Sequence, residues 1–180
     1  LAEIVPLEKI EPIDIYVYPT VVDLQAALPD SGMKDFPSNQ FELGVILLTA
    51  ANAKMAETEL PQSIPYELAH LLLFRAAGQQ VASLPWWLRE GIAGSIRPNT
   101  NPHHDQLLAE AIQNKATITL NELCDQPQGT GARQDLASLQ SASVVRFIVE
   151  HQPTGTRPDL LSIYINGENC ERGVQKALGT

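Results

Sequence analysis

The chain has 180 residues, of which 44% are hydrophobic and 18% are charged, and its formal net charge is −9. This is long enough to bury a core, so we expect one domain. The acidic balance and the lack of a Lys/Arg cluster argue against nucleic-acid binding, because phosphate contacts need clustered basic side chains. No apolar run approaches the roughly 18–20 residues that span a bilayer, so we expect no membrane-spanning segment.

The first elements combine a strand with a short helix. Residues 1–12 include two prolines and show no clean period, so we expect an N-terminal arm. Residues 13–18 (IDIYVY) alternate and are rich in β-formers, which predicts a strand. Thr20 is suited to cap a helix over residues 21–28, with an acidic side chain in its first turn.

The sheet-containing part of the chain, residues 13–60, is expected to end without regular structure. Residues 29–40 (PDSGMKDFPSNQ) have loop chemistry throughout. Residues 41–49 (FELGVILLT) are continuously apolar, which predicts a second strand in the interior of a sheet. The Ala-rich residues 50–60 are ambiguous, and we favour a loop or one irregular helical turn.

Two facing helices are expected in residues 61–97. Ser63 is a plausible N-cap for the first helix and Pro65 suits its first turn. Gly78 suits its end, because glycine adopts the backbone conformation that often follows a helix. Pro85 then opens a second helix that we expect to run to about residue 96.

The remaining part, residues 98–180, is expected to be mostly helical. Apolar side chains recur there at helical spacing, separated by Pro- and Gly-containing breaks. The predicted helices are residues 104–114, 136–150, 158–165 and 171–178, with a short extended piece at 117–123 that leads into a turn. Strands followed by many helices predict an α+β fold.

A cluster of chemically active residues falls on the two facing helices. Tyr66 and His70 are four residues apart and share a helix face, with Glu67 on the flank of that face. Glu90 lies on the following helix. A catalytic zinc needs about three protein ligands and a water, and a nearby carboxylate can take the proton from that water. In a HExxH helix the two histidines bind the metal and the glutamate is the base.

Taken together, YELAHLLL and LPWWLREGIAGSI resemble the gluzincin branch of zinc metallopeptidases, in particular the peptidase-MA-like domains of bacteria. The second motif of that family is matched by Pro85, Trp87, Leu88, Glu90, Gly91 and Ala93. The helix LQSASVVRFIVEHQ and the closing segment GVQKALGT also resemble the family. The resemblance implies a zincin-like fold, in which a small N-terminal β-sheet and an active-site helix precede a mostly helical C-terminal half.

The resemblance also implies roles for individual residues. Glu67 stands in the position of the general base, and His70 and Glu90 stand in ligand positions for zinc, with peptides as the substrate class. Two functional positions depart from the family pattern. Tyr66 replaces the first histidine ligand, and Ser138 stands where the family often has a tyrosine that could stabilise an oxyanion. Binding zinc as a phenolate costs a deprotonation that a neutral histidine avoids.

We therefore predict a degenerate metallopeptidase-like domain that lacks hydrolytic activity, binds zinc weakly or not at all, and acts as a binding or structural module for a peptide or protein. The alternative is an active zinc peptidase with non-standard ligation by His70, Glu90 and either Tyr66 or a loop histidine. A third possibility is that the Glu67–His70 pair is structural and the motif accidental, as in a helical interaction domain.

Without a metal, the polar groups of this cluster need other partners. The hydroxyl of Tyr66 could occupy the space of the metal and bond to His70 or Glu90. Glu67 and Glu90 would repel each other, so that either one of them is protonated or His70 is charged between them.

Two further groups were weighed as site residues. His103, His104 and Asp105 could swing toward the site, but we favour an exposed loop and helix start. Trp86 and Trp87 could line a peptide groove, and we expect at least one of them to pack in the core instead.

The two cysteines, Cys124 and Cys170, form no CxxC pair, which argues against zinc ligation by thiolates. They could form one disulfide or remain two buried thiols, and we favour the thiols. The chain begins at Leu1 and shows no signal peptide. We expect it to be a piece of a longer bacterial protein that is extracytoplasmic or attached to a membrane.

Overall fold

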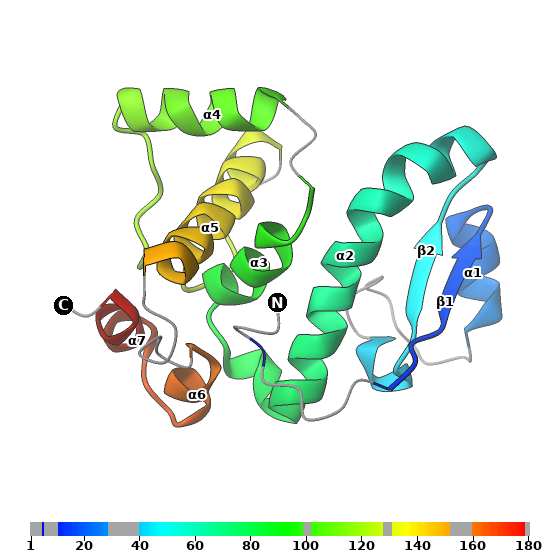
Figure 1. Ribbon diagram of the computed structural model, residues 1–180, viewed down its shortest axis with the longest axis horizontal. Coiled ribbons are helices and arrows are strands. Elements are labelled where there is room, and N and C mark those ends of the chain that lie inside the picture. Colours follow the sequence, from blue (N-terminus) through cyan, green and yellow to red (C-terminus); the bar gives the residue numbers. More distant parts are fainter. Residues whose placement is uncertain are drawn as a thin grey trace.

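Two short parallel strands lie at one end of a mostly helical body in the computed structural model (Figure 1), so the fold is α+β. The structure describes residues 5, 11–28, 40–98, 102–127, 131–151 and 160–178. Strand β1 (Ile15–Tyr18) pairs with β2 (Ile46–Thr49), Ile15 opposite Ile46 and Tyr18 opposite Thr49.

Helix α1 (Val21–Ala27) follows β1 and begins as predicted. The side chain of Thr20 accepts a hydrogen bond from the backbone N–H of Asp23 at 3.1 Å and also donates one to its carboxylate. The predicted strand and helix are therefore both confirmed, each slightly shorter than expected. The loop predicted at residues 29–40 lies outside the described residues except for its last one.

The second strand starts later than the sequence suggests. Residues Gln40–Leu43 form a 3-10 turn, and Gly44 follows with a positive φ of 70°. Within the described residues β2 pairs with β1 alone, so its apolar character does not come from a central place in a sheet. Ile46 and Leu48 are instead buried against Leu71 of the next helix.

The long helix α2 (Ala53–Ala77) corrects two expectations. It begins ten residues before Ser63, and its N-cap is Asn52, whose side chain accepts a hydrogen bond from the backbone N–H of Met55 at 3.0 Å. Pro61 and Pro65 lie inside the helix, so the boundary expected between residues 60 and 61 falls within α2. Figure 1 shows the axis bending in the N-terminal half of α2, as internal prolines make helices bend.

The end of α2 and the start of α3 agree with the sequence. Gly78 ends α2 with a φ of 57° and donates its N–H to the carbonyl of Phe74. A 3-10 segment (Gly78–Ser83) follows, and α3 (Trp86–Ser95) has Pro85 as its N-cap. In the segment predicted to be extended and to lead into a turn, residues 117–119 have no regular structure and residues 120–123 form turns. Leu123 and Cys124 at its end accept hydrogen bonds from the first backbone N–H groups of α3.

Four more helices complete the described chain. They are α4 (Pro102–Gln113), α5 (Ala132–His151), α6 (Leu160–Ile165) and α7 (Cys170–Leu178). All four were predicted, and α5 starts four residues earlier than expected. None of the helices in the described part of the chain has the length and apolar character that a bilayer crossing needs.

Helix α3 lies in the centre of the core and packs closely on α5. Its residues Trp87, Leu88 and Ile92 are fully buried. A Cβ built on Gly91 would lie 2.6 Å from the carbonyl oxygen of Ser141 and 2.6 Å from Cγ2 of Val145. The two helices can therefore approach this closely only because residue 91 has no side chain.

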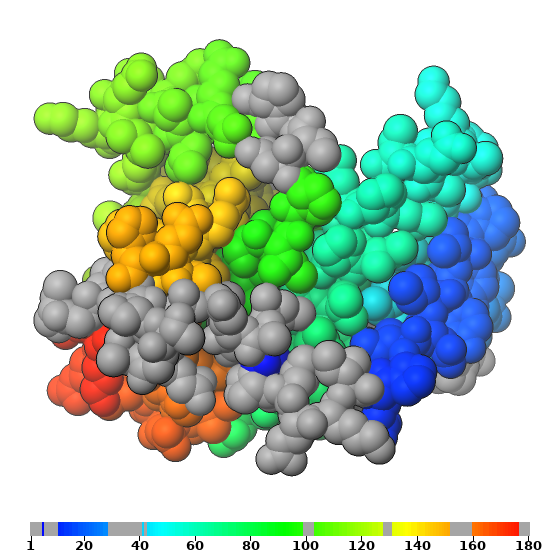
Figure 2. Space-filling view, in the orientation of Figure 1, coloured from blue at the N-terminus to red at the C-terminus, as the bar shows by residue number. Residues whose placement is uncertain are grey.

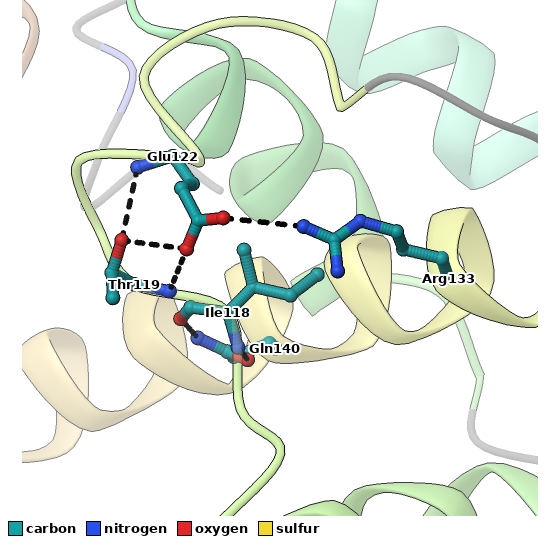
Figure 3. Close-up of polar contacts among 5 residues, drawn as sticks. All are labelled: Ile118, Thr119, Glu122, Arg133 and Gln140. Carbon is teal, nitrogen blue, oxygen red and sulfur yellow. Dashed lines mark hydrogen bonds and ion pairs between the residues drawn. The ribbon is translucent and has the colours of Figure 1, made fainter.

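A glutamine on α5 holds the turn segment in place (Figure 3). The side chain of Gln140 accepts a hydrogen bond from the backbone N–H of Ile118 at 3.0 Å and donates one to its carbonyl. Nearby, Glu122 accepts bonds from Thr119 and from Arg133 of α5. Gln140 thus has a structural role, since it fixes the segment that caps α3.

The two cysteines form a disulfide, which corrects the expectation of free thiols. Cys124 and Cys170 are bonded with their Cα atoms 5.9 Å apart. The bond joins the turn that caps α3 to the first residue of α7. It closes a loop across 46 positions of the sequence, so it restrains most of the C-terminal half.

Candidate functional site

The facing helices α2 and α3 bring three of the sequence-predicted residues together. The hydroxyl of Tyr66 donates a hydrogen bond to Oε2 of Glu90 at 2.6 Å. His70 lies edge-on to Tyr66, with ring centroids 4.7 Å apart, and its Nε2 is 3.6 Å from Oε1 of Glu90. The expectation that the tyrosine hydroxyl bonds to one of these partners is confirmed, and the partner is Glu90.

Burial perturbs the acidic groups of the site. It raises the pKa of Glu90, and the hydrogen bond from Tyr66 and the nearby Arg89 and Arg97 oppose this effect. It also raises the pKa of Glu67, where Arg97 opposes the effect and Glu90 adds to it. Desolvation is therefore the larger cause, and the mutual repulsion expected between the two glutamates contributes less.

Burial also keeps the other two groups uncharged. It lowers the pKa of His70 to about 4, with Arg89 and Arg97 adding to the effect. A pKa this low favours a neutral His70 at pH 7 over the alternative of a charged histidine between two glutamates. Burial, followed by the charge of Glu90, raises the pKa of Tyr66 far above its ordinary value, so its hydroxyl stays protonated and acts as a donor.

Arg97 is a residue of the site that sequence reasoning missed. Its guanidinium lies 4.2 Å from the centroid of the Tyr66 ring, which is a cation–π contact. It also acts electrostatically on Glu67, His70 and Glu90. Helical spacing could not have found it, because Arg97 lies beyond the C-cap of α3 at Ile96.

A second missed residue is Phe41, from the turn before β2. Its ring stacks on His70 with centroids 5.9 Å apart and an interplanar angle of 23°. This contact comes from a segment that the sequence placed in a strand. No spacing along the chain connects Phe41 to His70, so only the packing of β2 on α2 reveals it.

The other candidates lie away from the cluster. Trp87 is fully buried and Trp86 is 6% exposed, so both pack in the core, as expected for at least one of them. Ser138 lies on α5 opposite Gly94 in the α3–α5 interface. His104 and Asp105 begin α4 and line a pocket with Arg97 rather than approaching His70.

The donor set of the cluster does not fit a catalytic zinc. Within the ranges that the structure describes, no three or more His, Cys, Asp or Glu side chains are grouped so that they could hold a metal. His70 and Glu90 make two donors, whereas a catalytic zinc takes about three. The next side chain, Tyr66, carries a protonated hydroxyl that already bonds to Glu90. Arg97 adds a positive charge that acts on both His70 and Glu90.

Comparisons with known proteins identify the family. A model of the peptidase MA superfamily matches residues 1–180. Searches of curated proteins and of solved structures gave no match. The matching family model covers the whole sequence, so the likeness of the motifs is not accidental. The chain belongs to the peptidase MA superfamily and has a metallopeptidase-like fold.

Proposed function

We propose that this chain is a zincin-like domain whose hydrolytic centre has been replaced by a hydrogen-bonded tyrosine–glutamate pair, and that it acts as a binding or structural module. The observation that carries the proposal is the 2.6 Å hydrogen bond from the Tyr66 hydroxyl to Glu90. It engages a carboxylate in a ligand position with a protonated partner, so no open metal site remains between α2 and α3.

Arg97 strengthens this argument electrostatically. In the family arrangement a divalent cation would balance the carboxylates of Glu67 and Glu90. Here a guanidinium acts on both of them from outside the helix pair. It supplies part of the positive charge without any metal and repels a cation that approaches the same groups.

The alternative, an active peptidase with His70, Glu90 and Tyr66 as ligands, requires the tyrosine to lose its proton. Burial and the neighbouring Glu90 charge both oppose that loss. A loop histidine as third ligand would have to leave the start of α4. Neither route has a supporting contact among the described residues.

The disulfide supports the proposed location of the domain. Disulfides persist in oxidising compartments and are rare where thiols are kept reduced. The Cys124–Cys170 bond therefore favours an extracytoplasmic domain, or one attached to the outer side of a membrane.

Elemental analysis of the purified protein tests the loss of the metal centre. We expect far less than stoichiometric zinc in the wild type, about one zinc ion per chain in Tyr66→His, and tighter binding when Arg97→Gln is added. Tyr66→Phe is the matched control, because it removes the hydroxyl without adding a ligand and should gain no zinc.

The proposal fails if the wild type carries stoichiometric zinc and hydrolyses peptides in a reaction that Glu67→Gln abolishes. Thermal unfolding with and without a chelator gives an independent check. Because a ligand that binds only the folded state stabilises it, an unchanged melting temperature is expected for the wild type. The Tyr66→His variant should instead lose stability when the chelator is added.

A further inference from the structure

A small basic pocket lies where the end of α3 meets α4 and α5. Its volume is about 250 Å³, and its lining includes Arg97, His104, Asp105, Leu108, Leu139 and Arg146. Figure 1 shows α4 lying above one end of α5, and the lining residues come from the end of α3, from α4 and from α5. In Figure 2 α4 lies above α5, on the side of the molecule away from the two strands.

The charge of this pocket is opposite to that of the whole chain. The protein has a formal net charge of −9, whereas the pocket has two guanidinium groups and one imidazole against the single carboxylate of Asp105. Arg146 is exposed and makes no hydrogen bond or ion pair with another described residue. Arg97 is also exposed, and its guanidinium lies 4.2 Å from the centroid of the Tyr66 ring.

The size and the apolar walls limit what the pocket can hold. Pockets for drug-sized ligands measure roughly 300–1,000 Å³, so this one suits a smaller group. Leu108 and Leu139 offer apolar surface beside the two arginines. Guanidinium groups bind carboxylates through paired N–H donors, with a geometry that a single ammonium lacks. The best occupant is therefore one amino-acid residue that carries a carboxylate.

Arg97 connects the pocket to the tyrosine–glutamate pair. It lines the pocket and also lies 4.2 Å from the centroid of the Tyr66 ring. A peptide whose acidic residue enters the pocket would thus lie beside Tyr66, which bonds to Glu90. We propose that Arg97 and Arg146 bind the carboxylate of a peptide or protein partner, supplied by a chain terminus or an acidic side chain. This inference rests on the binding part of the proposed function.

Calorimetry with matched peptides tests the pocket. The probes are an N-acetylated tetrapeptide that ends in leucine with a free carboxylate, the same peptide as its C-terminal amide, and amidated versions with Glu or Gln in the last position. We expect at least one carboxylate form to bind about tenfold more tightly than its neutral partner. A preference within the first pair of peptides identifies a chain terminus as the source of the carboxylate, and a preference for Glu over Gln identifies an acidic side chain.

Arg146→Gln should reduce this preference to about twofold or less. Arg172→Gln is the control, since it removes an equal charge from α7, outside the pocket, and should keep the preference. Ser143→Leu fills the pocket without changing charge and should weaken both peptide forms. Arg146 is exposed, so unchanged melting temperatures should show that its variant is folded.

The inference is overturned if the wild type binds acidic and neutral peptides equally, or if Arg146→Gln keeps the full preference. Analysis of each peptide for cleavage products tests the proposed function separately from the binding preference. Hydrolysis would contradict the proposed function while leaving the role of Arg146 measurable. If the peptides are neither bound nor hydrolysed, the proposed carboxylate site is contradicted, whereas a purely structural role of the domain is not.

Discussion

Helix α3 contacts its two neighbours in different ways. Towards α5 the contact is steric, because Gly91 leaves no room for any side chain against Ser141 and Val145. Towards α2 the contact includes a polar part, in which a hydrogen bond from Tyr66 reaches the half-buried carboxylate of Glu90. The α3–α5 contact thus has no room for an added atom at residue 91. At the α3–α2 contact, in contrast, one polar partner of Glu90 can replace another and still form a hydrogen bond.

Removing the disulfide should lower the unfolding free energy most, because the bond closes the loop that contains α5. The double variant Cys124→Ser/Cys170→Ser loses the restraint on a loop of 46 positions. The chain-entropy estimate for such a loop is about 4 kcal/mol of unfolding free energy. Urea unfolding under non-reducing conditions measures it. Adding a reductant to the double variant should change nothing further, and a variant as stable as the wild type would contradict a stabilising role for the bond.

A side chain on Gly91 should be the next most damaging change. The added methyl of Gly91→Ala would lie 2.6 Å from a backbone oxygen and 2.6 Å from a buried methyl group, so α3 and α5 must separate. We expect a net loss of about 2 kcal/mol, because overpacking outweighs the gain in helix propensity. Denaturant unfolding measures the loss.

Gly94→Ala is the matched control on the same helix. Its Cβ would meet the side chain of Ala142 at 3.0 Å, a tight contact that a small shift can relieve. It should cost clearly less than Gly91→Ala. Equal losses for the two variants would mean that the steric limit is not centred on residue 91, and the comparison between the two faces of α3 would weaken.

Local signals predicted most of the helices, and the main failure has a tertiary cause. Thr20 and Gly78 begin and end helices as their chemistry suggests. Ser63 and Pro65 were interpreted as the start of α2, whereas Pro61 and Pro65 both lie inside the helix, where a proline removes a hydrogen bond. The helix nevertheless continues through both, because Ile64 and its apolar neighbours pack on β2. That gain depends on contacts that no local window contains.

The cluster was predictable in membership but not in its bonds. Helical spacing put Tyr66 and His70 on one face, and the second motif supplied Glu90. The sequence left open whether the tyrosine hydroxyl bonds to His70 or to Glu90, because the choice depends on how α2 and α3 cross. The disulfide was mispredicted for a similar reason, since a separation of 46 positions says nothing about distance until the turn docks on α3.

Removing one oxygen atom tests the polar face of α3 and should have the smallest of the three effects. Tyr66→Phe keeps the ring, its packing on His70 and its contact with Arg97, but leaves the half-buried carboxylate of Glu90 without its 2.6 Å donor. An unsatisfied buried polar group costs about 1–3 kcal/mol, and more when it is charged. Denaturant unfolding should therefore show a loss of about 1–2 kcal/mol, since Arg97 still offsets part of the charge.

Tyr16→Phe is the matched control, because Tyr16 is 48% exposed on β1 and its hydroxyl can bond to water in either state. It should change the unfolding free energy by less than about 0.5 kcal/mol. If Tyr66→Phe behaves like this control, the hydroxyl does not stabilise Glu90, and the polar face of α3 would be a vacant site rather than a satisfied one. A clear difference between the two variants would instead mean that the Tyr66 hydroxyl stabilises the folded pair of α2 and α3. A substitution that restores a metal ligand at residue 66 would then also have to make up for the lost hydrogen bond to Glu90.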